Sequence, residues 1–387
     1  MLPATTDVLI VGAGPVGLAT ATALAQAGVA VTVTDRAPGA AHTSRAAVVH
    51  ARTLEVLDRI GAAAPLVDAG IPAPRFTIRD RDRVLVPVTF DTLPTPYPYA
   101  LMVPQSTTEA VLGDRLTAAG GTVLRGYEAT GLDGRTVTFA TGERVTARYV
   151  VAADGMHSTL RHLAGIGFGT SGAGGSATTG GESFTLADVQ VHGGPPRDEV
   201  VLYFSRAGLL VWAPLPDGTV RIVAAVGDAP EQPGAAYIQF LLDGRGPVRE
   251  RARVDDVVWG SRFRVHHRVA DTFRAGPVLL AGDAGHVHSP AGGQGMNLGL
   301  RDALALAGAL TETLGSGSET PLDRYAAERR PAAREVVRFA SRLTRLATVP
   351  APLRPLRNGA LSALSLLPAF RESLAFRLSS LERPAHR

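Results

Sequence analysis

Short apolar runs separated by a glycine-rich turn dominate the first forty residues. Asp7–Val11 is rich in β-branched residues and predicts a buried strand, which leads directly into the turn Gly12-Ala13-Gly14-Pro15-Val16-Gly17. Leu18–Ala27 has the composition of a helix, and Val29–Thr34 predicts a second strand. The chain is therefore expected to open with a strand, a turn, a helix and a second strand.

The turn in this unit has the glycine spacing of a dinucleotide-binding fingerprint. Gly12 permits a tight turn, Gly14 lets a pyrophosphate approach the backbone, and Gly17 lets the helix pack closely on the strand. The second strand ends in an acidic residue, which can accept a hydrogen bond from a ribose hydroxyl. At this point FAD and NAD(P) both remain open as ligands. The candidate dinucleotide-binding residues are Gly12, Ala13, Gly14, Pro15, Gly17, Asp35 and Arg36.

The middle of the chain has the alternating pattern of a second, antiparallel sheet. Residues 74–98 alternate short β-rich runs with prolines, and four further strands are predicted at Ser183–Val191, Glu199–Ser205, Leu209–Leu215 and Val220–Val226. Phe204, Trp212 and Pro214 share strand parity, so we expect them to face a substrate cavity, with ordinary core burial as the alternative.

The tail, residues 322–387, is rich in arginine and helical in period. Gly359–Phe370 is uncharged but contains Pro368, and it is shorter than the roughly 20 residues that a membrane-spanning helix needs. We therefore predict a packed helix or a subunit contact here, and no stable membrane insertion.

Composition removes several kinds of chemistry. The chain has 387 residues and a formal net charge of +4, and all of its basic groups other than histidine are arginines. With no concentrated basic run, no nucleic-acid partner is expected. The absence of cysteine removes disulfides and thiolate chemistry, and the absence of lysine removes Schiff-base and Walker-type phosphate chemistry. A bound cofactor is the simplest remaining source of demanding chemistry.

Two histidine pairs are the nearest approach to a metal site. His266 and His267 are adjacent, which makes convergence on one ion difficult, and His286 and His288 lack nearby acidic or sulfur partners. No metal is predicted. The amino terminus shows no signal-peptide pattern, so a cytoplasmic protein is expected.

Two later segments complete a recognisable pattern. Arg148–Ala153 predicts a strand that feeds the motif DGMHSTLR, and Val278–Ala281 predicts another that feeds GDAGHVHSPAGGQGMNLGLRDA. Together with GAGPVG, in this order and spacing from Asp7 to about Arg345, they resemble the group A FAD-dependent aromatic hydroxylases, monooxygenases of the para-hydroxybenzoate hydroxylase fold.

The resemblance implies tightly bound FAD. Asp283 is then expected to hold a ribityl hydroxyl, and a helix beginning near Met296-Asn297 would point its positive end at the N1–O2 edge of the flavin. Further implied cofactor-binding positions are Arg45, Gln105, Asp154, Gly155 and Gly295. The loop expected to line the peroxide side of the flavin, and so to act in catalysis, contains Pro290, Gly292 and Gly293.

The implied fold is α/β. Residues 1–73, 99–168 and 275–345 would form a discontinuous Rossmann-like FAD-binding domain, a βαβ unit within a three-layer ββα sandwich. Residues 74–98 and 169–274 would form an inserted mixed or antiparallel β-sheet domain that binds substrate, and 346–387 a C-terminal helical segment. Many larger members carry a thioredoxin-like domain beyond this point.

The implied activity is hydroxylation of an aromatic or polyketide-type small molecule with O2. NADPH or NADH would serve as a transient reductant, and a flavin C4a-hydroperoxide would deliver the oxygen. Epoxidation, Baeyer–Villiger oxidation and antibiotic inactivation remain alternatives, as does a non-catalytic FAD-binding protein. A flavin halogenase is disfavoured because its lysine is missing. Monomer and homodimer are both left open.

Overall fold

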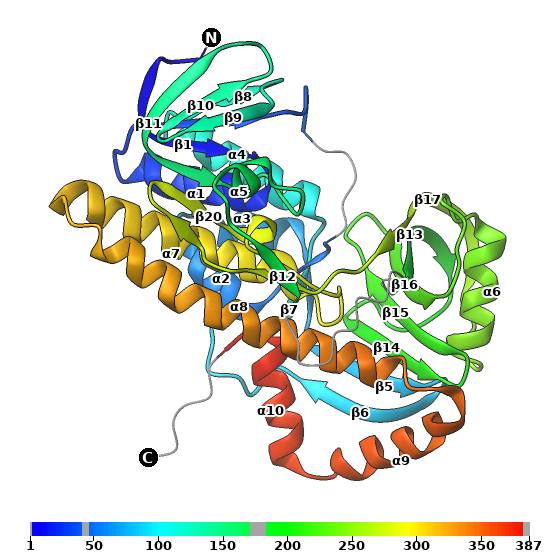
Figure 1. Cartoon of the computed structure of the whole chain (residues 1–387). Coiled ribbons are helices and arrows are strands. Elements are labelled where there is room, and N and C mark those ends of the chain that lie inside the picture. Colours follow the sequence, from blue (N-terminus) through cyan, green and yellow to red (C-terminus); the bar gives the residue numbers. More distant parts are fainter. Residues whose placement is uncertain (1, 41–45, 171–182, 382–387) are drawn as a thin grey trace.

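A computed structural model describes residues 2–40, 46–170 and 183–381 (Figure 1). Its largest unit is a sheet of eight strands with β1 at its centre. Five of the strands run parallel because each returns through a crossover. In spatial order the parallel strands are β8 (Val123–Arg125), β2 (Val31–Asp35), β1 (Thr5–Val11), β11 (Arg144–Ala152) and β20 (Val278–Leu280). Antiparallel strands complete the sheet: β9 (Ala129–Asp133), β10 (Thr136–Phe139) and β19 (Arg274–Ala275).

Helix α1 (Pro15–Gln26) packs between α4 (Gln105–Ala118) and α7 (Gln294–Ser316). It begins three residues earlier than the sequence pattern predicts, because a proline suits the first helical position. Contact with α7 is close at Gly299, where an added Cβ atom would lie 2.6 Å from the Val16 side chain. The α/β class expected from the sequence is confirmed.

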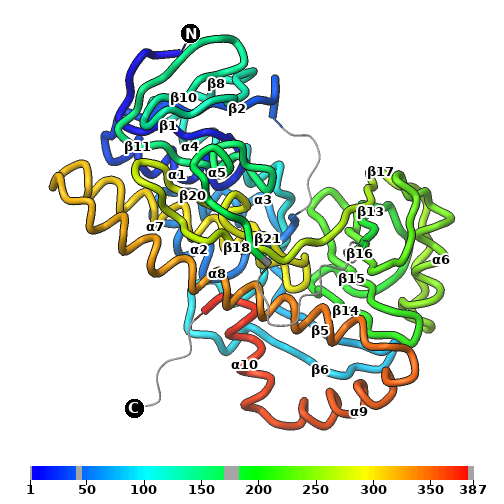
Figure 2. The backbone as a smooth tube through the Cα atoms, in the orientation of Figure 1, coloured from blue at the N-terminus to red at the C-terminus, as the bar shows by residue number. Residues whose placement is uncertain are grey.

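A second, seven-stranded sheet lies beside the first, and the chain enters it twice. Figure 2 shows these passages as the cyan segment that carries β5 and β6 and the green segment that includes β13 to β16. Its spatial order is β17 (Arg253–Arg264), β13 (Ser183–His192), β16 (Val220–Val226), β15 (Gly208–Pro214), β14 (Glu199–Ser205), β5 (Arg75–Asp80) and β6 (Arg83–Thr89). One face packs on α6 (Ala235–Arg245) through its own apolar cluster, so the opposite face is available to a cavity.

Short elements connect the two sheets. Three-stranded sheets are formed by β3 (Val48–Val49), β7 (Ala100–Met102) and β4 (Ile71–Ala73), and by β12 (Phe168–Thr170), β18 (Arg268–Ala270) and β21 (His286–Val287). The remaining α-helices are α2 (Ala51–Asp58), α3 (Ala63–Ala69), α5 (Thr159–Leu163), α8 (Thr320–Ala347), α9 (Arg354–Leu364) and α10 (Pro368–Leu378). Figure 1 shows α8 crossing from the first sheet to the second, with α9 and α10 below it.

None of the helices in the described ranges has the length and apolar character that crossing a membrane requires. The division of the chain into an FAD-binding part and a substrate-binding part stays a prediction.

Candidate functional site

The glycine turn has the close contacts that its spacing predicts. Gly12 has φ +108°, and an added Cβ on Gly17 would lie 1.8 Å from the Gly12 carbonyl oxygen. An added Cβ on Gly14 would meet nothing within 4 Å, so space is open above the turn at the start of α1. The Asp35 carboxylate accepts hydrogen bonds from the backbone N–H of Ala13 and of Ala37, both at 2.7 Å. Asp35 therefore also fastens the turn to the end of β2.

Arg161 joins the second motif to the third. Its guanidinium donates to the carbonyl oxygens of Met156 (3.1 Å) and Ala284 (3.0 Å) and lies 3.9 Å from the ring centre of Phe168. Asp154 accepts from the Leu160 N–H, and burial raises the pKa of its carboxyl. The DGMHSTLR motif thus connects its own turn to the backbone that follows Asp283.

A buried ionic triad holds the strand that follows Asp283. His286 donates from Nε2 to Asp302 at 2.6 Å, and Arg329 donates to the other carboxylate oxygen at 2.7 Å. Burial alone would raise the pKa of Asp302, but Arg329 and His286 lower it below its usual value. Neither His286 nor Asp302 is exposed to solvent, so the triad serves to fix β21, α7 and α8 together.

The loop before α7 takes its shape from glycine and from Asn297. Gly293 has φ +62°, and an added Cβ would lie 2.2 Å from the Val48 side chain. Asn297 accepts from the His50 N–H at 2.7 Å and donates to the carbonyl oxygens of Val48 and Gly293 at 2.9 and 2.8 Å. His50 donates from Nε2 to the Gly292 carbonyl oxygen at 2.9 Å, and burial lowers its pKa to about 4.

The structure adds two details about this helix. The helix begins at Gln294, earlier than expected, so the N–H groups left without an intrahelical partner are those of Gln294, Gly295 and Met296. Asn297 is fully buried and its side-chain donors and acceptor are used within the protein. Its side chain positions the loop, and a contact between Asn297 and the cofactor stays a prediction.

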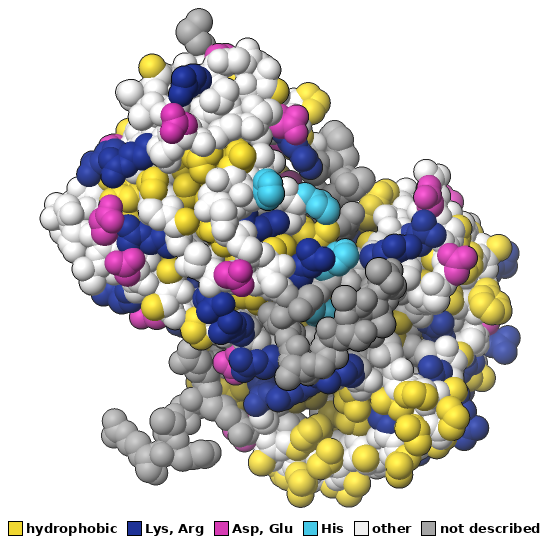
Figure 3. Space-filling view, viewed as in Figure 1, with side chains coloured by type: hydrophobic (Ala, Val, Ile, Leu, Met, Phe, Trp, Pro, Cys, Tyr) yellow, Lys and Arg dark blue, Asp and Glu magenta, His cyan; other side chains and the backbone are white. Residues whose placement is uncertain are grey.

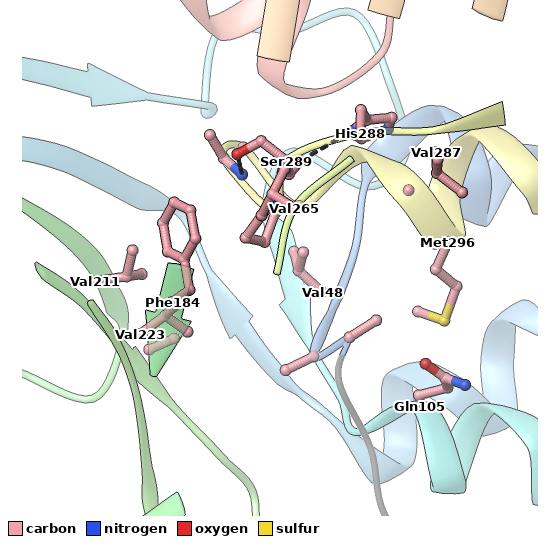
Figure 4. A pocket seen from close by; sticks show the side chains of 18 of the residues that line it. Val48, Gln105, Phe184, Val211, Val223, Val265, Val287, His288, Ser289 and Met296 are labelled. Atoms are coloured by element: carbon pink, nitrogen blue, oxygen red, sulfur yellow. Dashed lines mark hydrogen bonds between the residues drawn. The ribbon is translucent and has the colours of Figure 1, made fainter. Parts of the chain in front are cut away.

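A cavity of about 620 Å³ extends from the glycine turn to the second sheet. Figure 4 shows Phe184, Val211 and Val223 on one side of it, with Val48 and Met296 across from them. Most of the wall is apolar, which suits a flat hydrophobic ligand. Of the residues expected from the sequence, those that line it are Gly14, Pro15, Gln105, Gly155, Phe204, Asp283, Pro290, Gly292, Gly293, Gly295 and Met296.

Strand parity misplaces two of the three expected substrate contacts. Phe204 pairs with Leu209, so the cavity-facing positions of β15 are the odd ones, such as Val211. Trp212 and Pro214 lie on the other face, where Trp212 belongs to the cluster packed on α6. Parity is fixed within one strand, but the relation between strands depends on register, which the sequence did not provide.

The remaining expected residues act from behind the cavity or stand outside it. Gly12 and Gly17 shape the turn, whereas Arg36 is exposed. Arg45 lies outside the described residues. Gln105, by contrast, lines the cavity; it donates to Glu109 at 2.9 Å, and burial raises the pKa of the Glu109 carboxyl.

Three polar residues of the wall are not among the site residues expected from the sequence. Arg221 is 3% exposed and forms a two-pronged ion pair with Asp188, each contact 2.7 Å long. His288 donates from Nδ1 to the Ser289 carbonyl oxygen at 2.7 Å (Figure 4), and burial lowers its pKa to about 4. His50 is the third. Only the folded chain brings these groups to one cavity.

In the part of the chain that the structure describes, no three His, Cys, Asp or Glu side chains gather in the way that a metal ion needs.

The arrangement fits FAD. Open space at Gly14 faces the start of α1, where backbone N–H groups favour a pyrophosphate. Asp283 is exposed at the cavity wall, where a carboxylate can accept from a ribityl hydroxyl. The first turn of α7 offers N–H donors to the negatively charged edge of a reduced flavin.

Comparison with known proteins gives the same answer. A profile described as an FAD binding domain matches residues 5–340. A curated relative, 6-methylpretetramide 4-monooxygenase from Streptomyces rimosus, is 40% identical over 349 residues. The match covers 84% of this chain and 59% of the relative, so the chain spans about three-fifths of the relative's length.

Two solved structures are similar over nearly the whole chain. An anhydrotetracycline hydroxylase from Streptomyces rimosus superimposes with a TM-score of 0.78 at 33% identity, covering 98% of this chain and 76% of its own. A p-nitrophenol 4-monooxygenase from Pseudomonas putida gives a TM-score of 0.81 at 25% identity, covering 99% of this chain and all of its own.

Proposed function

The chain belongs to the FAD-binding-domain family that its match over residues 5–340 identifies, and we propose that it is an FAD-dependent monooxygenase. Its substrate is a polycyclic aromatic or polyketide-type phenol, and NAD(P)H and O2 are its co-substrates. The observation that carries this proposal is a single cavity that joins the Gly14 turn to an apolar sheet wall. Relatives named 6-methylpretetramide 4-monooxygenase and anhydrotetracycline hydroxylase support the substrate class.

Hydride uptake from NAD(P)H and activation of O2 are the chemistry that FAD supplies when bound. The chain contributes the geometry around it. The Gly12–Gly17 turn and α1 hold the phosphates, and Asp283 accepts from the ribityl chain. The N–H groups of Gln294, Gly295 and Met296 stabilise negative charge at the flavin edge.

The sheet wall orients the substrate. Phe184, Val211 and Val223 face the cavity and present apolar surface to a flat ring system. Arg221 is held rigidly by Asp188, so it offers a fixed positive charge toward a phenolate or carbonyl oxygen at the wall. The apolar lining also excludes water from the reacting atoms, which limits wasteful side reactions with water.

The test is oxygen incorporation by purified, FAD-loaded protein. Tricyclic and tetracyclic phenols are supplied with NADPH or NADH under labelled O2, and products are analysed by mass spectrometry and NMR. We expect substrate to accelerate NAD(P)H oxidation and one labelled oxygen atom to appear as a ring hydroxyl. An epoxide product would show that the reaction is epoxidation, and a ring-expanded ester would show that it is Baeyer–Villiger oxidation, in place of hydroxylation. Stoichiometric FAD with no oxygen transfer to any aromatic compound would refute the proposal.

A further inference from the structure

The outer surface of α9 and its flanking turns is apolar throughout. Between residues 351 and 369, every exposed position is Ala, Pro, Leu or Gly, and we call these positions the α9 face. Leu353, Leu356, Leu364, Leu366 and Leu367 are 54%, 74%, 43%, 80% and 56% exposed. Figure 3 shows yellow side chains gathered at the bottom of the molecule, where Figure 1 places α9. A contiguous group of this kind marks an interaction site far more often than scattered exposed leucines do.

Two polar residues of α9, Arg357 and Asn358, point inward and fix this orientation. Arg357 is 6% exposed and donates to the carbonyl oxygens of Phe204 (2.7 Å), Leu346 and Ala347 (both 3.1 Å). Asn358 donates to Asp80 (2.9 Å) and to the Phe204 carbonyl oxygen. Turning the helix to bury its leucines would leave these groups without partners, at a large cost in free energy. The leucines are therefore held outward by the fold.

We propose that the α9 face is the contact surface of a homodimer. A two-fold contact sets each residue near the axis against its own copy, so exposed charges there would meet charges of the same sign. The α9 face has none at its exposed positions. Depletion of charge in this way is typical of a dimer core. Exposed Arg83 contacts Ser362 at the edge of this face, and basic residues in such a position also suit a lipid surface, so the experiment below includes lipid binding as an outcome.

The face is also complementary to itself. Small residues, Gly359, Ala360 and Ala363, lie between Leu356 and Leu364, which are eight residues and about two helical turns apart. When two copies of α9 cross antiparallel near Ala360, Leu356 of each lies opposite Leu364 of the other, and the small residues let the helices approach. The face is smaller than the roughly 20–30 residues a side of a standard interface, so a micromolar dissociation constant is expected.

Sedimentation velocity of the FAD-loaded full chain over roughly 0.5–100 μM tests the proposal. The wild type is expected to pass from one to two chain masses in this range. Leu356→Glu is expected to raise the dissociation constant roughly 100-fold, because an unpaired carboxylate enters an apolar contact. Phe240→Glu is the matched control: this residue is 71% exposed on α6, outside the α9 face, and its replacement should leave the dimer unchanged.

A charge pair gives the sharper test. Leu356→Glu combined with Leu364→Arg places opposite charges against each other twice in the antiparallel dimer, so it should recover most of the affinity that Leu356→Glu loses. Melting temperature and flavin absorbance should match the wild type in every variant. A wild type that stays monomeric to 100 μM, a Leu356→Glu protein that dimerises normally, or failure of the pair to recover affinity would overturn the proposal. So would a monomer that floats with anionic lipid vesicles.

Discussion

Replacing Gly14 and Gly17 with alanine, one at a time, separates cofactor binding from folding. The two glycines lie three residues apart in one turn, yet an added Cβ meets nothing within 4 Å at Gly14 and a backbone oxygen at 1.8 Å at Gly17. Gly14 has φ −75°, which any residue adopts, so Gly14→Ala carries no backbone strain. If the open space holds the pyrophosphate, the two variants must fail in different ways.

The magnitudes follow from these contacts. Gly14→Ala should leave apoprotein stability nearly unchanged, because the gain of about 0.4–1 kcal/mol from restricting the unfolded chain is offset by alanine being a poorer N-cap of α1 than glycine. The new methyl group would force a phosphate away from the backbone N–H groups. Loss of one charge-assisted hydrogen bond, about 1.5–3 kcal/mol, corresponds to a roughly 10- to 150-fold weaker FAD complex. Gly17→Ala must move backbone by more than an ångström, so we expect at least about 3 kcal/mol of destabilisation.

The assay is a pair of measurements on each variant. Urea unfolding of apoprotein gives stability, and quenching of FAD fluorescence gives the dissociation constant. Gly14→Ala is expected to raise the FAD dissociation constant without lowering the stability of the apoprotein. Gly17→Ala is expected to lower the stability of the apoprotein. Wild-type FAD affinity in a folded Gly14→Ala protein would refute the placement of the pyrophosphate at this turn.

Three further predictions concern residues around the cavity. Asn297→Ala should destabilise the protein by about 3–5 kcal/mol in urea unfolding, because three buried backbone groups lose their partner; a loss below about 1 kcal/mol would contradict its role as a positioning residue. Asp302→Asn should cost about 3–5 kcal/mol near neutral pH, since it leaves Arg329 without its buried counter-charge. The pKa of Asp302 in the folded protein is below its usual 3.8, so the stability that its ionised carboxylate contributes is complete above pH 3.8 and is lost as the pH falls through the folded pKa. Below pH 3.8 the wild type should therefore lose more stability than Asp302→Asn. Parallel acid-unfolding curves of the two proteins would disprove this. Val211→Phe adds a larger side chain to the cavity wall and should weaken binding of an aromatic substrate roughly tenfold in a fluorescence titration. Trp212→Phe, on the opposite face of the same strand, should leave substrate binding unchanged and lower stability by about 1 kcal/mol. Equal effects of the two variants on substrate binding would show that the assigned faces are wrong.

The His286–Asp302–Arg329 triad shows why this fold keeps charges in its interior. Its three members come from β21, α7 and α8, and removing one leaves the others buried without compensation. His286 also lines the cavity, two residues before the loop that begins at His288. Stability of the fold and the shape of the cavity therefore depend on the same residues.

Local sequence was sufficient to predict the structure of a segment where the interactions that determine it lie within that segment. In the Gly12–Gly17 turn, the contact between Gly17 and the Gly12 carbonyl oxygen lies within six residues, so that part of its geometry follows from the glycine positions, whereas Gly12 also packs against Ala153. Strand β14 and strand β16 have the predicted bounds, because alternation and turn residues mark them locally. The GDAGHVHSPAGGQGMNLGLRDA segment indicates a flavin site through its resemblance, together with the other two motifs, to the group A hydroxylases.

Tertiary structure decided whatever depends on the relation between segments. The register between β14 and β15 sent Trp212 away from the cavity, and the start of α7 made Asn297 a clamp on residues nearly 250 positions earlier. Arg221 and His50 joined the cavity wall without any motif. The apolar composition of Gly359–Phe370 predicts burial, but three of its leucines are exposed to solvent. The inward hydrogen bond from Arg357 to the Phe204 carbonyl oxygen holds the helix in this orientation. Hydrophobic pattern specifies which residues seek burial, and long-range packing and hydrogen bonds select which of them obtain it.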